Sequence, residues 1–93
     1  MVSSVEEIVE ANTYLEKAKD ELRSAQIPFE ENIPVGAMIE TPAAALIVDR
    51  ILDIVDYISI GTNDLIQYVL AVDRINEHVA HLYQPFHPSV LKI

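Results

Sequence analysis

The hydrophobic and polar positions in the first third of the chain follow a helical pattern between residues 3 and 25. Apolar residues recur there at steps of three, four and seven, at Val5, Ile8, Leu15, Ala18, Leu22 and Ala25. A capping-box spacing, serine followed by glutamate three residues later, occurs at Ser3 and again at Ser4. Pro28 disfavours a helical conformation in the residue before it. The pattern therefore predicts an amphipathic helix that ends before Pro28.

Two short apolar runs in the middle of the chain predict β-strands. Residues 35–39 read Val-Gly-Ala-Met-Ile, a nearly uninterrupted apolar run like those of strands that are buried on both faces. Residues 57–60 read Tyr-Ile-Ser-Ile and are followed by Gly61. Strands buried on both faces are typical of parallel sheets, so we expect these two strands to run parallel.

Each predicted strand is followed by the start of a helix. Thr41 can cap a helix over residues 42–55, in which a proline occupies the first position and loses no hydrogen bond. After the second strand, Thr62 or Asn63 can cap a helix over residues 64–72. The sequence thus predicts a helix on the carboxyl side of both strands.

The order helix, strand, helix, strand, helix is the alternation of an α/β fold with a parallel sheet and right-handed crossovers. Glu40 directly follows the first strand and Asp64 follows the second, so one βα unit separates them. We therefore expect both acids at the carboxyl edge of the sheet, where α/β folds bind their ligands. Two parallel strands cannot close a sheet, and a full (β/α)₈ barrel needs about 250 residues.

Two carboxylates at that edge indicate a cation site. Neighbouring strands lie about 4.8 Å apart, so Glu40 and Asp64 would repel each other unless a cation lay between them or one were protonated. Mg²⁺ suits such a pair, because it takes one or two carboxylates and completes its coordination with water and substrate oxygens. The alternative is that both acids lie at helix N-termini only because the helix dipole favours negative charge there.

An anion site is the second candidate at this edge. Residues 61–64 read Gly-Thr-Asn-Asp, and free N–H groups at a helix start bind anions, although an ordinary strand-to-helix turn looks the same. Arg74 can hold a phosphate through two hydrogen bonds, or it can form a surface ion pair with Asp73 or Glu77. A helix over residues 64–72 is about 13 Å long. Arg74 therefore reaches the edge only if this helix lies across it.

Composition excludes several classes of protein. Six Lys and Arg against 15 Asp and Glu give a net charge of −9, which argues against nucleic acid as a partner. The absence of cysteine excludes disulfides, cysteine-based zinc sites and a thiol nucleophile within this chain. The 51% hydrophobic content is enough for a folded core. No apolar run approaches the roughly 18 residues of a membrane helix and no signal peptide opens the chain, so we expect a cytoplasmic setting without a membrane.

Several motifs, taken together and in order, resemble a known family. They are Gly-Ala-Met-Ile-Glu-Thr-Pro at 36–42, Ser-Ile-Gly-Thr-Asn-Asp-Leu-Ile-Gln-Tyr at 59–68, Ala-Val-Asp-Arg at 71–74, Leu-Tyr-Gln-Pro at 82–85 and Pro-Ser-Val-Leu at 88–91. Over essentially its whole length the chain resembles the C-terminal phosphoenolpyruvate (PEP)-binding domain of the enzyme I family, the PEP–protein phosphotransferases of bacterial sugar uptake. The segments Glu-Thr-Pro at 40–42 and Gly-Thr-Asn-Asp-Leu at 61–65 are shared with the pyruvate phosphate dikinases and PEP synthases, so a fragment of such a relative is the alternative.

The resemblance implies a fold, a cofactor and site residues. The matching domain of the family is a (β/α)₈ TIM barrel, of which residues 1–93 would form a fragment of about two and a half βα units. By resemblance, Glu40 and Asp64 are ligands of Mg²⁺, and Asn63, Asp64 and Arg74 bind PEP. The physical chemistry agrees, since Mg²⁺ and an arginine neutralise charge on a transferring phosphoryl group.

The resemblance also implies the reaction and its partners. The family passes a phosphoryl group from PEP to a histidine on another domain and then to the carrier protein HPr, and the parent protein would be a homodimer. No residue of this chain matches that histidine or the cysteine that protonates the enolate. The resemblance thus places no catalytic residue within the chain, and we expect the chain alone to be inactive. A non-catalytic fragment that associates with itself through open sheet edges is a third interpretation.

Overall fold

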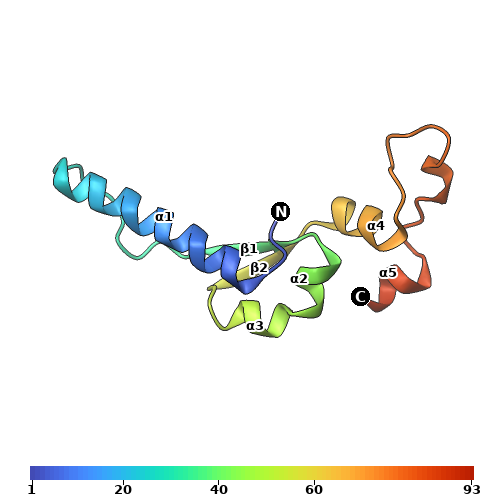
Figure 1. Cartoon of the computed structure of the whole chain (residues 1–93), viewed down its shortest axis with the longest axis horizontal. Coiled ribbons are helices and arrows are strands. Elements are labelled where there is room, and N and C mark those ends of the chain that lie inside the picture. Colours follow the sequence, from blue (N-terminus) through green and yellow to red (C-terminus); the bar gives the residue numbers. More distant parts are fainter.

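Two short parallel strands at the centre of the molecule connect a long N-terminal helix to a smaller helical end (Figure 1). The computed structural model describes residues 1–93, and the molecule is elongated, with dimensions of 54 × 28 × 18 Å. Its elements in order are α1 (Val5–Ser24), β1 (Gly36–Ile39), α2 (Pro42–Leu46), α3 (Val48–Leu52), β2 (Tyr57–Ile60), α4 (Thr62–Leu70), the 3₁₀ helix η1 (Ala80–Leu82) and α5 (Pro88–Lys92).

Helix α1 confirms the prediction for residues 3–25, and its start uses the second of the two predicted caps. The Ser4 hydroxyl accepts a hydrogen bond from the backbone N–H of Glu7 at 3.3 Å. The Glu7 carboxylate accepts from the backbone N–H of Ser3 at 2.8 Å and from its hydroxyl. These bonds from Ser3 lower the pKa of Glu7. The Glu7 N–H, one of the unpaired N–H groups in the first turn of α1, thereby has an acceptor, and the bonds from Ser3 hold the preceding residue against the helix start.

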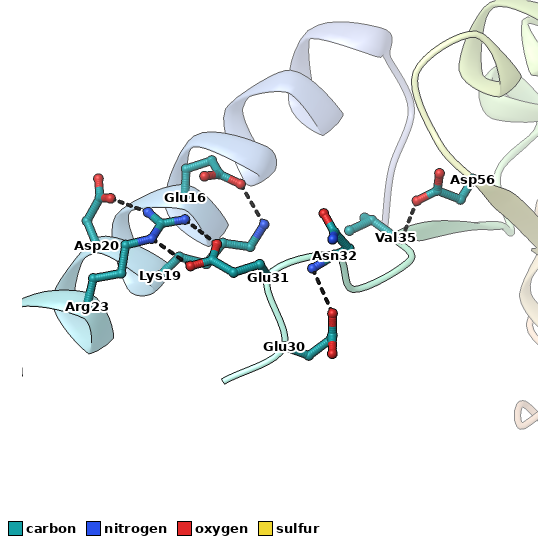
Figure 2. A network of polar contacts seen from close by, with 9 residues as sticks. All are labelled: Glu16, Lys19, Asp20, Arg23, Glu30, Glu31, Asn32, Val35 and Asp56. Carbon is teal, nitrogen blue, oxygen red and sulfur yellow. Dashed lines mark hydrogen bonds and ion pairs between the residues drawn. The ribbon is translucent and has the colours of Figure 1, made fainter. Parts of the chain in front are cut away.

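A clamp of polar contacts ties the connector between α1 and β1 back onto the helix (Figure 2). The Arg23 guanidinium donates to Glu31 on the connector and to Asp20 on the helix, and it lies 5.5 Å from the centre of the Phe29 ring. The hydrogen bonds from Arg23 lower the pKa of Glu31. The connector therefore runs back along α1 and delivers the chain to the start of β1.

The sheet is parallel, as the apolar runs predicted. Gly36 pairs with Tyr57 and Ile39 pairs with Ile60, with the two intermediate pairs in the same register. One face of the sheet packs on α1 and on the helices that follow β1, around a buried core of Ile8, Ala37, Ile39, Ala44 and Ile51. The α/β class with a parallel sheet is confirmed, whereas the (β/α)₈ barrel stays a prediction because this chain contains two strands.

The prediction of one continuous helix over residues 42–55 is wrong. The helical segment is not a single helix. It is broken at Ile47, whose φ of −117° and ψ of 23° are not helical, into α2 and α3, and α3 ends at Leu52. The start is as predicted, since Thr41 caps α2 and Pro42 occupies its first turn. Residues on both sides of the break, Ala44 in α2 and Ile51 in α3, are fully buried. The turn at Ile47 thus lets both short helices face the core.

Candidate functional site

The carboxyl ends of β1 and β2 form one edge, which carries the residues that the sequence singled out. Ile39 and Ile60 are the last paired residues, and the Gly61 N–H still donates to the Ile39 carbonyl at 2.9 Å. Glu40 therefore follows β1 directly opposite the Gly61 that follows β2. The prediction that Glu40 and the start of α4 emerge at the same sheet edge is confirmed.

Gly61 leaves the space that the Glu40 side chain occupies. A Cβ atom built on Gly61 would lie 2.8 Å from the Cβ and 2.9 Å from the Oε2 of Glu40, closer than real side-chain atoms approach. The φ of Gly61 is −83°, so its role is spatial and not conformational. Glu40 is half-buried, and the sulfur of Met38 lies 3.2 Å from the same built Cβ.

Asp64 lies in the first turn of α4, where the helix dipole favours a negative charge. It is half-buried, and its Oδ1 accepts a hydrogen bond from the side-chain amide of Gln67 at 3.3 Å. The predicted cap by Thr62 or Asn63 is wrong, because Gly61 is the N-cap and no side chain caps α4. The start of α4 therefore presents backbone N–H groups without a side-chain acceptor.

Asn63 and Thr62 are exposed and line one side of a mostly apolar cavity of about 700 Å³. The cavity lies between the sheet, α4 and the C-terminal segment, with ten apolar residues among the thirteen that line it. Its remaining lining is Ile39, Ala45, Val48, Ile58, Ile60, Leu65, Ile66, Tyr83, Pro85, Val90 and Ile93. Asn63 thus sits where the start of α4 meets this cavity.

Arg74 is brought back over α4 by a tight turn. Ala71 caps α4 in the left-handed conformation, with a φ of 53°. The Val72 N–H then bonds the Gln67 carbonyl at 3.0 Å, and the Arg74 N–H bonds the Gln67 side-chain oxygen at 2.8 Å. The backbone of Arg74 therefore lies beside the middle of α4 and not one helix length beyond Asp64.

The Arg74 side chain is exposed, and the structure shows no ion pair between it and Asp73 or Glu77. The Asp73 carboxylate instead accepts from the backbone N–H of Ile75. Gln67 is the residue that sequence reasoning missed. Its signal was the spacing of three residues from Asp64, which places two helical side chains next to each other.

The number of carboxylates at the edge fits a hard divalent cation. No three histidine or acidic side chains gather as a complete metal cage, and the three histidines form no such group. Mg²⁺ needs one or two carboxylates and otherwise uses water and substrate oxygens. Glu40 and Asp64 on one edge supply that number, and the Gly61 position keeps Glu40 against the start of α4.

Comparison with known proteins places the chain in a family. The family described as PEP-utilising enzyme, PEP-binding domain, matches residues 1–93. The chain belongs to this family. It is 52% identical over all 93 residues to a phosphoenolpyruvate-protein phosphotransferase of Buchnera aphidicola from Acyrthosiphon pisum, and 55% identical over 91 residues to that of Haemophilus influenzae. It is 48% identical over 93 residues to that of Lactococcus lactis subsp. cremoris.

The match covers 98–100% of this chain, yet the chain spans only 16% of the length of each of these relatives. The resemblance to the PEP–protein phosphotransferases is confirmed by the names of these relatives, which favour it over the dikinase and synthase alternative. In the structure, no helix combines the length and the apolar character that crossing a membrane requires.

Proposed function

We propose that this chain forms the PEP- and Mg²⁺-binding part of a PEP–protein phosphotransferase. The observation that carries the proposal is the shared edge of β1 and β2, which holds Glu40 and Asp64 within a chain that the PEP-binding family matches from end to end. Residues 1–93 would form about two and a half βα units of a (β/α)₈ barrel. Residues 1–93 would thus be a fragment of that PEP-binding domain.

Each side chain at the edge has a role in this proposal. Glu40 and Asp64 would hold Mg²⁺, which would supply positive charge to offset the negative charge of PEP. Asn63 donates a hydrogen bond to the phosphate at the start of α4, where the helix dipole also favours an anion. Arg74 is the only Lys or Arg between Arg50 and Lys92, and its unpaired guanidinium is available for the phosphate.

The reaction of the parent protein belongs to the same proposal. The phosphoryl group of PEP passes to a histidine outside this chain and then to HPr, in a cytoplasmic homodimer that serves sugar uptake. The chain contains no cysteine to protonate the enolate. We therefore expect the 93 residues alone to bind PEP weakly and not to convert it to pyruvate, and turnover by the purified chain would contradict this.

The metal site is tested by titrating the chain with Mn²⁺, whose free form is read by electron paramagnetic resonance. We expect Glu40→Gln and Asp64→Asn each to weaken Mn²⁺ binding at least tenfold, because each removes one of two carboxylates. Asp49→Asn is the matched control, since this exposed acid lies in α3 away from the edge. Equal Mn²⁺ affinity in all four proteins would refute the ligand assignment.

A further inference from the structure

The side chain of Gln67 makes two hydrogen bonds that join the two halves of the proposed site. Its Nε2 donates to Oδ1 of Asp64 at 3.3 Å, and its Oε1 accepts from the backbone N–H of Arg74 at 2.8 Å. The two partners fix the orientation of the amide, because a carboxylate only accepts and a backbone N–H only donates. Only a side chain with both a donor and an acceptor satisfies both contacts.

The position of Gln67 follows from the way α4 packs. Leu65 and Ile66 are buried, whereas Gln67 is half-buried and lies one turn after Asp64. The left-handed turn at Ala71 and the burial of Val72 then fix the chain as it reverses. The backbone N–H of Arg74 consequently contacts α4 at Gln67, the only side chain to which it donates a hydrogen bond.

We propose that Gln67 is a positioning residue that links Asp64 to the turn carrying Arg74. The bond to Asp64 occupies Oδ1 and leaves Oδ2 without a hydrogen bond, which favours one carboxylate orientation toward a cation. Hydrogen bonds of this kind orient metal ligands in many proteins. The bond to Arg74 holds the start of its loop at a fixed place along α4. This inference rests on the proposed function, in which Asp64 binds Mg²⁺ and Arg74 binds phosphate.

Two substitutions separate the two hydrogen bonds. Gln67→Met has a similar length and removes both, whereas Gln67→Glu keeps the acceptor for the Arg74 N–H and removes the donor for Asp64. Gln84→Met is the matched control, because the side chain of this exposed glutamine makes no hydrogen bond in the structure. Circular dichroism of each variant verifies that the helical content is retained.

The first measurement is hydrogen exchange of the Arg74 backbone amide by NMR, which needs neither metal nor PEP. We expect exchange to be at least tenfold faster in Gln67→Met than in the unchanged chain, and to be restored by Gln67→Glu. This rescue by an acceptor is a signature that general loosening of α4 would not produce. Unchanged exchange in Gln67→Met would overturn the link to Arg74.

The second measurement is the Mn²⁺ affinity of the same proteins. We expect Gln67→Met to bind Mn²⁺ about tenfold more weakly, as loss of a hydrogen bond to a metal ligand does elsewhere, and Gln84→Met to bind as the unchanged chain does. Unaltered affinity in Gln67→Met, together with the expected weakening in Glu40→Gln, would overturn the positioning role and leave the proposed function standing. Absence of Mn²⁺ binding by the unchanged chain would overturn the proposed function itself, while the exchange of the Arg74 amide would still report on the contact.

Discussion

At the scale of single residues, the site depends on one position that has no side chain. Gly61 faces Glu40 across the end of the sheet, and any Cβ there would overlap the Cβ of Glu40, which cannot swing away as the tip of a flexible side chain can. The acid that follows β1 and the glycine that follows β2 are therefore one structural unit. Any side chain introduced at Gly61 would therefore displace the carboxylate of Glu40.

We expect Gly61→Ala to destabilise the chain by about 1–3 kcal/mol through overpacking, and to weaken Mn²⁺ binding because Glu40 is displaced. Gly36→Ala is the control at the other end of the same strand pair. There the three atoms nearest to the new Cβ, all within 2.6 Å, belong to the ring of Tyr57, which is 55% exposed and can turn toward solvent. Urea unfolding and Mn²⁺ titration measure both effects, and equal Mn²⁺ affinity in the two variants would contradict the role of Gly61.

The spacing of Glu40 and Asp64 predicted that both follow strands of one parallel sheet, because the βα unit fixes which edge each strand end reaches. The contact between Gly61 and Glu40 was not predictable, since it depends on which way a side chain turns at the end of β1. The role of Gln67 was predictable only in part, because its spacing of three residues from Asp64 indicates the first of its two contacts. Its second partner, Arg74, reaches it only because Ala71 takes a left-handed conformation that alanine rarely adopts.

At the scale of elements, the cap of α2 links two parts of the chain that are distant in sequence. The Thr41 hydroxyl accepts from the N–H of Ala44 at 3.1 Å and donates to the carbonyl of Val2 at 2.9 Å. It thus starts α2 and at the same time holds the N-terminal residues against the end of β1. One hydroxyl therefore stabilises a helix start and a contact between segments.

We expect Thr41→Ala to lower the free energy of unfolding by about 1–2 kcal/mol, the usual loss for a helix N-cap. Thr13→Ala is the control, because this exposed hydroxyl in the middle of α1 bonds only the carbonyl of Glu10 in its own helix. Alanine is the better helix former, so its effect should stay within about 0.5 kcal/mol. Urea unfolding followed by circular dichroism measures both, and equal losses would show that the Thr41 cap has no special role.

Some helix boundaries are determined by the local sequence, and others are determined by the packing of the core. The starts of α1 and α2 were predictable because Ser4 and Thr41 carry the acceptor that a helix start requires. The break at Ile47 was not predictable, because no glycine or proline marks it. The break allows both Ala44 and Ile51 to be buried in the core, and this burial depends on how the whole core packs.

At the scale of the whole molecule, the balance between buried and exposed apolar surface is unusual. Only 8 of 93 residues are buried, although 51% are hydrophobic. Large apolar side chains on several elements stay mostly exposed, among them Leu46, Ile60, Ile75 and Phe86. The two strands pair only with each other, so each keeps one open edge. Open edges and exposed apolar patches favour association with further protein.

We expect the isolated chain to associate with itself as its concentration rises, as the third interpretation of the sequence predicted. The net charge of −9 opposes this, so association should increase when salt screens the repulsion. Sedimentation velocity at low and high salt measures both dependences. Ile60→Lys, which puts a charge on the exposed end of β2, should reduce association, and a monomer under all these conditions would contradict the prediction.

The parallel pairing of β1 with β2 has a consequence for the order in which the molecule assembles. Val35 and Asp56, which bond each other at the start of the sheet, are only 21 residues apart, and the entropic cost of closing a loop is smaller for a short loop than for a long one. Glu40 lies within this loop and Asp64 lies just after it. The acidic pair therefore belongs to a locally formed unit that can fold early, whereas Arg74 joins it only after α4 has ended and the chain has reversed. This spacing along the chain predicts that Glu40 and Asp64 come together before the positively charged Arg74 reaches them.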